Sequence, residues 1–165
     1  MCIRDSTYGW TAERLARKQA AAGQPGFLYY FDHGYPSAER EGLHAFHASE
    51  IPYVFGTEDQ TPEYWPSIPS DRAERALGDA IQAYWAAFAR TGNPGAAGGA
   101  EWPAFAEDVA NLHIGDTAEV RTGLHPGRYE LHEEAACRKR AAGLPWTWNI
   151  GLASPALPPK GTACP

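Results

Sequence analysis

Long apolar runs, clustered basic charge and closely spaced cysteines are all scarce in this chain of 165 residues. No apolar stretch approaches the roughly 18 residues that a membrane-spanning helix needs, so we expect no membrane span. Lys and Arg number 14 against 20 Asp and Glu, and the net charge of -6 disfavours nucleic acid as a partner. The cysteines, Cys2, Cys137 and Cys164, are too few and too far apart for a zinc site, although Cys137 and Cys164 could form a disulfide.

The composition is otherwise that of a globular domain, with 44% hydrophobic and 21% charged residues. Residues 1–6, MCIRDS, match no element start, and we expect them to be a sequencing or cloning scar. Residues 7–152 should form the folded part, and the proline-rich residues 153–165 an extended or disordered tail. The start carries no signal-peptide pattern, but a scar would hide one, so secreted, periplasmic and cytoplasmic locations all stay open.

Hydrophobic periodicity and turn residues predict the order helix, strand, loop, helix, strand, helix. The helices are expected at residues 12–22, 72–90 and 130–142, the strands at 27–31 and 109–114, a short extended piece at 120–122, a loop at 35–42 and an irregular stretch at 57–70. The basic run 138–140 then lies at the end of a helix, where cations complement the helix dipole.

Both longer helices carry end signals and an apolar face. Asp71 with Glu74 forms a capping-box pattern, and residues 91–94, TGNP, are a stop signal. Thr11 is the expected cap of the first helix, and Gly23 should close it. The residues expected to face a neighbour are Leu15, Ala16 and Ala20 in the first helix and Ala73, Leu77, Ile81, Trp85 and Phe88 in the second.

The run at residues 27–31, FLYYF, is apolar throughout and is typical of a strand buried on both faces. Such a strand needs parallel neighbours, and the pattern offers one other convincing strand. We therefore expect an α/β fold whose central sheet is incomplete, with one edge of this strand unpaired.

The spacing of His44, His47 and Glu50 allows two interpretations. On a helix they could ligate a divalent metal, but a helical zinc pair usually sits four residues apart with its glutamate inside the pair. Alternatively, His47 ends a loop, and a short helix capped by Ser49 begins after it, with Pro52 in its first turn. An imidazole at that place can act as a general base.

A histidine base works with a hydroxyl nucleophile and a carboxylate that orients its ring. The chain has no Gly-x-Ser-x-Gly nucleophile elbow. In α/β-hydrolases the order along the chain is serine, acid, histidine, so a piece from the C-terminal end would hold the histidine alone.

Residues 45–56, AFHASEIPYVFG, resemble the catalytic-histidine segment of type-B carboxylesterases, which include bacterial para-nitrobenzyl esterases and cholinesterases. The usual form there is His-Gly-x-Glu, and Ala48 replaces the glycine. Three further segments resemble this family in the same order along the chain: GFLYYFDH at 26–33, YWAAFARTGNP at 84–94 and EWPAF at 101–105. The ending PWTWNIGL at 145–152 is similar to C-termini of some bacterial members.

The resemblance implies the C-terminal portion of an α/β-hydrolase fold that cleaves small carboxylic esters without a cofactor, with His47 as the triad base. The serine, the acid and the oxyanion-hole glycines would lie in the N-terminal part of the same polypeptide, and the fragment alone should be inactive. Glu50 is not expected to belong to the triad. His33 is expected to hydrogen-bond locally in a turn, and His44 is expected to line the active-site gorge or to face solvent.

Two other functions remain open. One is a catalytically inactive binding or adhesion relative of the same fold. The other is a small metal-binding domain that uses His44 and His47. Tyr84, Trp85 and Phe88 are expected to pack in the core, whereas Tyr53 and Phe55 could pack there or line an acyl pocket.

Overall fold

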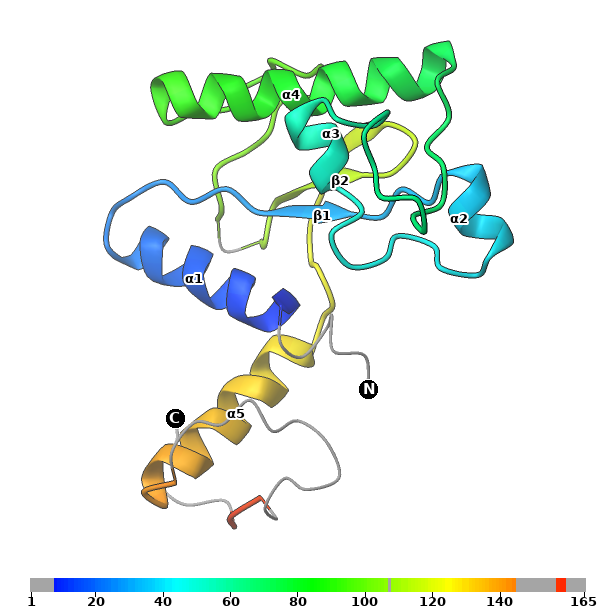
Figure 1. The fold of residues 1–165 in the computed structure, drawn as a ribbon. Coiled ribbons are helices and arrows are strands. Elements are labelled where there is room, and N and C mark those ends of the chain that lie inside the picture. The colour runs from blue at the N-terminus through cyan, green and yellow to red at the C-terminus, as the bar shows by residue number, and fades with distance from the viewer. Residues whose placement is uncertain (1–7, 107, 145–156, 160–165) are drawn as a thin grey trace.

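The structure is a computed structural model that describes residues 8–106, 108–144 and 157–159. Its elements are α1 Trp10–Ala21, β1 Tyr29–Phe31, α2 Pro36–Arg40, α3 Ile51–Phe55, α4 Arg72–Thr91, β2 Asn111–Ile114, β3 Ala118–Arg121 and α5 Arg128–Ala141 (Figure 1). The expected helices and strands are all present with shifted bounds. The expected loop at residues 35–42 instead contains α2, which Pro36 begins with its preset φ angle.

The described strands form one sheet in the order β1-β2-β3. β1 runs parallel to β2, with Tyr29 opposite Leu112, and β2 runs antiparallel to β3, with Asn111 opposite Arg121. Among the described residues no strand pairs with the other edge of β1, as the sequence predicts. The residues of β1 are half-buried, so the expected burial on both faces is not reached here.

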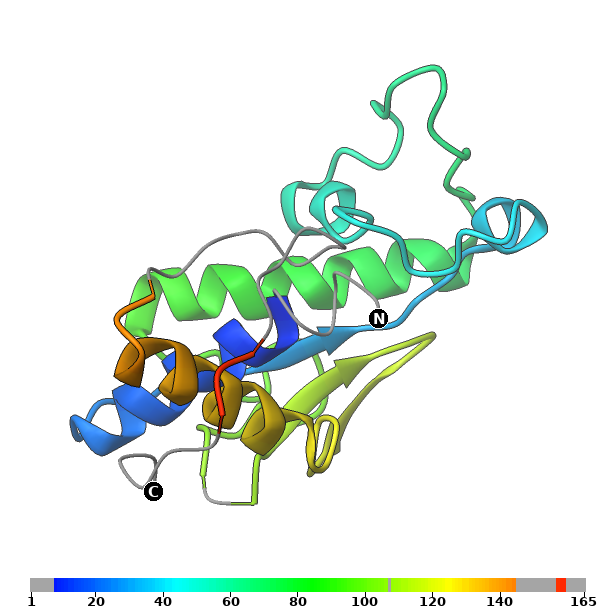
Figure 2. The same cartoon turned by 90° about the horizontal axis from the view of Figure 1, so that it is seen from below.

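Helices cover both faces of the sheet (Figures 1 and 2), in agreement with the predicted α/β class. On one face α4, with α3 packed against it, contributes Leu77 and Ile81 to the main core, which also holds Leu112 of β2. On the other face Ala16 of α1 packs with Leu28 and Phe105, and α5 contacts α1.

The ends of α4 follow the sequence signals. The carboxylate of Asp71 accepts hydrogen bonds from the backbone N–H groups of Ala73 at 2.8 Å and Glu74 at 3.0 Å. Gly92 ends the helix with φ +74°, a left-handed conformation that glycine adopts without strain.

The buried face of α4 differs from the expected one. Ala73 and Phe88 are exposed and Glu74 is buried, contrary to expectation, whereas Tyr84 is buried in the core as predicted. The reason is tertiary: the Tyr84 hydroxyl donates to the carbonyl of Ala100 at 2.5 Å, which draws that side of the helix onto the loop before Trp102.

The first helix also departs from its pattern. Its N-cap is Gly9, and the hydroxyl of Thr11 donates to the carbonyl of Tyr8, so Thr11 does not cap the helix. Ala16 is buried as expected, but Leu15 is exposed, because the buried face of α1 runs through Trp10, Glu13 and Ala16. Ala20 is likewise exposed.

The last described helix, α5, carries residues 138–140 in its final turn, as predicted. Cys137 is disulfide-bonded. Cys164, which the sequence analysis leaves open as a partner, lies outside the described residues, and so do the segment 145–152 and most of the expected tail. None of the described helices combines the length and the hydropathy that crossing a membrane requires.

Candidate functional site

His47 lies in a turn between α2 and α3 whose backbone is held in place. The N–H of Ser49 donates to the carbonyl of Phe46 at 3.1 Å, and the Phe46 ring packs on Trp65 with 4.8 Å between centroids. Ala48 has φ +69°, a left-handed conformation that costs an L-residue about 1–2 kcal/mol relative to glycine. That geometry explains why glycine suits the position after the histidine and shows that Ala48 is strained there.

The side chain of His47 is exposed. Its ring stacks on Tyr8, with 5.5 Å between centroids and 25° between the planes. No hydroxyl or carboxylate from the described residues hydrogen-bonds with its imidazole. The described part of the chain therefore presents a histidine without the nucleophile and acid that a triad needs.

The structure separates His44 from His47. His44 has φ +52° and is exposed, and its Nδ1 lies 2.9 Å from Oε2 of Glu39. Residues 44–47 are not helical, so these two histidines do not share a helix face with Glu50. No group of three metal-ligating side chains occurs within the described ranges.

The short helix expected after His47 is α3, and Pro52 lies in its first turn as predicted. Its N-cap residue is Glu50, and no side chain caps it, so the expected cap by Ser49 is wrong. Ser49 is instead fully buried, and among the described residues its hydroxyl has no hydrogen-bond partner. Phe55 is 72% exposed, whereas Tyr53 is completely buried.

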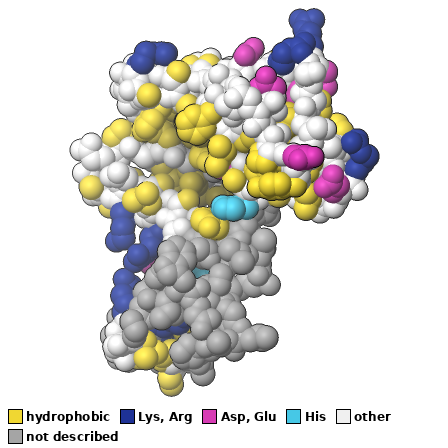
Figure 3. Space-filling view, in the orientation of Figure 1, with side chains coloured by type: hydrophobic (Ala, Val, Ile, Leu, Met, Phe, Trp, Pro, Cys, Tyr) yellow, Lys and Arg dark blue, Asp and Glu magenta, His cyan; other side chains and the backbone are white. Residues whose placement is uncertain are grey.

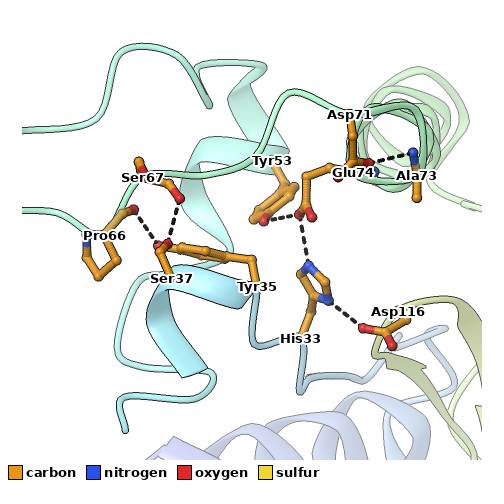
Figure 4. A network of polar contacts seen from close by, with 10 residues as sticks. All are labelled: His33, Tyr35, Ser37, Tyr53, Pro66, Ser67, Asp71, Ala73, Glu74 and Asp116. Carbon is orange, nitrogen blue, oxygen red and sulfur yellow. Dashed lines mark hydrogen bonds and ion pairs between the residues drawn. The ribbon is translucent and has the colours of Figure 1, made fainter. Parts of the chain in front are cut away.

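A second cluster, which the sequence analysis missed, surrounds His33 (Figure 4). His33 is 6% exposed, and its Nε2 lies 2.8 Å from Oε1 of Glu74 while its Nδ1 lies 3.0 Å from Oδ1 of Asp116. The hydroxyl of Tyr53 donates to the same Glu74 oxygen in a very short hydrogen bond. The expectation of local contacts for His33 is therefore wrong, because its partners come from α4 and from the β2–β3 turn. We call His33, Tyr53, Glu74 and Asp116 the His33 cluster.

Burial by itself would lower the pKa of His33, but the hydrogen bonds and charges of Glu74 and then Asp116 outweigh it, so the pKa is raised. With both ring nitrogens facing carboxylates, the protonated imidazolium can donate two hydrogen bonds at once. Burial and the bond to Glu74 raise the pKa of Tyr53, so its hydroxyl stays protonated and donates.

Three members of the cluster, His33, Glu74 and Asp116, line a cavity of about 390 Å³, which Glu39 and Asp71 also line. One sequence signal could have located it. His33 closely follows β1, and Asp116 closely follows the parallel strand β2, so both lie at the carboxyl edge of the sheet, where side chains from different strands meet. Nothing local identifies Glu74 as the third member, since its position in a first helical turn already explains it.

Comparison with known families and proteins gives a consistent result. The profile of the carboxylesterase family matches residues 1–132. A medium-chain fatty acyl-CoA hydrolase precursor from Anas platyrhynchos is 32% identical over 134 residues, which cover 78% of this chain and 23% of the relative. Carboxylesterase 3B from Mus musculus is 35% identical over 127 residues, covering 72% of this chain and 22% of the relative.

Solved structures agree with these relatives. The Geobacillus stearothermophilus carboxylesterase EST55 superposes with a TM-score of 0.57 at 29% identity, covering 73% of this chain and 24% of that one. A para-nitrobenzyl esterase gives 0.56 at 27% identity, over 67% of this chain and 22% of its own. The chain thus spans about a quarter of the length of the relatives it matches, and its incomplete sheet is part of an α/β-hydrolase fold. The chain belongs to the carboxylesterase family.

Proposed function

We propose that this chain supplies His47 as the general base of a serine carboxylesterase, with the serine, the acid and the oxyanion donors on another stretch of polypeptide. The observation that carries the proposal is an exposed imidazole on a turn whose backbone is fixed on both sides, in the segment that resembles the family's histidine motif. Glu50 is not assigned to the triad, because it is the N-cap residue of α3, where a carboxylate favours the helix dipole.

In this reaction His47 takes the proton of the serine hydroxyl as the serine oxygen forms a bond to the ester carbonyl carbon. The bond from that carbon to the alcohol oxygen then breaks, and the imidazolium returns its proton to the departing alcohol. Water repeats the attack on the acyl-enzyme with His47 again as base, which releases the carboxylic acid and restores the serine.

The described part of the chain has a free strand edge and exposed apolar side chains, which further polypeptide would cover. One edge of β1 has no described partner strand. Ile51 and Phe55, one turn apart on α3, are 47% and 72% exposed, and hydrophobic side chains gather below α4 on the face in Figure 3. Exposed apolar surface of this kind is typical of an interface.

The test joins this chain to the upstream part of the EST55 carboxylesterase that it does not match, and measures hydrolysis of a para-nitrophenyl ester. The chain alone should not exceed the buffer rate, whereas the chimera should hydrolyse the ester. His47→Gln should lower kcat by at least about 10³-fold, because a triad without its base retains only the contribution of the oxyanion hole and binding.

His44→Gln is the matched control, because His44 lies three positions away and pairs with the exposed Glu39. Its kcat should stay within about threefold of the parent chimera, far from the loss expected of a missing triad member. A His47→Gln chimera that keeps its activity would refute the assignment. The coding sequence upstream of this chain should also encode a Gly-x-Ser-x-Gly elbow, and its loss would favour a binding protein instead.

A further inference from the structure

The His33 cluster lies where four parts of the chain meet. His33 follows β1, Tyr53 belongs to α3, Glu74 to the first turn of α4, and Asp116 to the β2–β3 turn. Glu74 is 7% exposed, so its carboxylate is almost removed from water. A buried carboxylate is costly unless it is paired and hydrogen-bonded, and Glu74 is bonded to both Tyr53 and His33.

We propose that Glu74 is a positioning residue for His47: by holding Tyr53 and His33 with one carboxylate oxygen, it fixes α3, and the turn before it, against α4 and the sheet. This rests on the proposed function, in which His47 is the base. Glu74 itself does not touch the reacting atoms in this assignment, and it acts through the backbone between residues 47 and 53.

The connection from Tyr53 back to His47 is short and hydrogen-bonded. The N–H of Val54 donates to the carbonyl of Glu50, and the N–H of Ile51 to the carbonyl of Ala48, both at 3.1 Å. The Tyr53 ring is fully buried. A displacement of Tyr53 therefore moves α3 as a unit and pulls on Ala48, the residue bonded to His47.

Two other carboxylates near His33, those of Asp71 and Glu39, already bind other groups. The carboxylate of Asp71 caps α4, and the exposed Glu39 pairs with His44. Of the carboxylates that face His33, Asp116 has a largely exposed side chain, and water can replace it easily. Glu74 is thus the acceptor whose loss leaves buried partners, the Tyr53 hydroxyl and His33 Nε2, without a bond.

The experiment compares Tyr53→Phe, which keeps the buried ring and removes its bond to Glu74, with Glu74→Gln, which keeps the shape and removes the charge. Glu39→Gln is the matched control, a carboxylate that lines the same cavity. Amide hydrogen exchange in the full chain should accelerate about tenfold at Ser49 and Ile51 in both test variants, because the turn opens locally more often.

The comparison amide is that of Leu112, which donates to Leu28 in the sheet at 2.9 Å. Its exchange should not change, and Glu39→Gln should leave all three amides at the parental rate. A variant that merely destabilised the whole fold would accelerate Leu112 equally, and that result would overturn the proposal. Unchanged exchange at Ser49 and Ile51 would overturn it as well.

In the EST55 chimera, Tyr53→Phe and Glu74→Gln should lower kcat about tenfold with little change in KM, because the base is misplaced while substrate contacts stay. If His47→Gln showed that His47 is not the base, the proposed function would fail, and the exchange measurement would still report whether Glu74 orders the turn. Suppose that amide exchange accelerates at Ser49 and Ile51 while kcat stays unchanged in a chimera whose activity depends on His47. That result would refute the positioning role of Glu74 and leave the proposed function intact.

Discussion

Replacing Gly98 with alanine should destabilise the chain, because the loop at Gly98 approaches α4 too closely for a side chain. A Cβ at this position would lie 2.2 Å from Cε2 of Tyr84 and 2.4 Å from the carbonyl oxygen of Ala80. Neither atom can yield easily. Tyr84 is fully buried with its hydroxyl bonded to Ala100, and the carbonyl of Ala80 belongs to the backbone of α4.

The magnitude follows from two opposing terms. Overpacking a tight site costs about 1–3 kcal/mol. Alanine lowers the conformational entropy of the unfolded chain relative to glycine, and this raises the free energy of unfolding by about 0.4–1 kcal/mol. The net loss of unfolding free energy should be about 1–2 kcal/mol, and for a chain of this size each kcal/mol lowers Tm by about 2–4 °C.

The assay is urea and thermal unfolding of Gly98→Ala beside Gly115→Ala. Neither glycine has a left-handed φ, and the nearest atom to a Cβ at Gly115 is 3.5 Å away, an ordinary contact. Gly115→Ala should therefore stay within about 0.5 kcal/mol of the parent. Equal stability of the two variants would refute the close approach of this loop to α4.

Two further predictions concern the His33 cluster and the His47 turn. Because the folded pKa of His33 lies above its ordinary value of 6.5, its bonds stabilise the fold fully below about pH 6.5, and this stabilisation is lost as pH rises through the raised pKa. Urea unfolding should thus show the largest deficit of His33→Gln at low pH, and a deficit that grows with pH would contradict the charged pairing. Ala48→Gly should stabilise the chain by about 0.5–1 kcal/mol in the same assay, because glycine relieves the left-handed strain at a smaller entropic cost. Ala45→Gly, at a position without left-handed φ, should destabilise it, and an equal response of both variants would refute the strain at Ala48.

The parts of the fold that the sequence predicts are those set by neighbouring residues. Asp71 and Gly92 give the ends of α4 to within one residue, because capping and left-handed closure are local chemistry. Neighbouring residues do not determine which face of the same helix is buried. The sequence predicts that Tyr84 packs in the core, but not what it contacts: Gly98 lets the loop come close enough for the Tyr84 hydroxyl to reach Ala100, and no periodicity within α4 contains that information.

The candidate site divides in the same way. The position of His47 before a short helix follows from Pro52 and the motif around it, although α3 begins one residue later than a Ser49 cap would place it. The His33 cluster could not be derived, because its hydrogen bonds join residues 41 and 83 positions apart along the chain. Asp32 and His33 after an apolar strand favour a turn in any sequence, and only the parallel pairing of β1 with β2 brings Asp116 to them.

Several locally unfavourable features of the structure lie near the short helix α3, and others lie at Val109 and His125. Two of the four non-glycine residues with positive φ in the described part are His44 and Ala48, on either side of His47. The buried carboxylate of Glu74 lies against the other end of this segment, at Tyr53. Strain and buried charge persist where the surrounding structure fixes them, and they gather at functional sites. A turn that only connected two helices would gain nothing from these costs, whereas a base must meet a hydroxyl from other polypeptide at a fixed place. Strain at His44 and Ala48 is therefore what we expect of a segment that holds the proposed base, His47, in a fixed place.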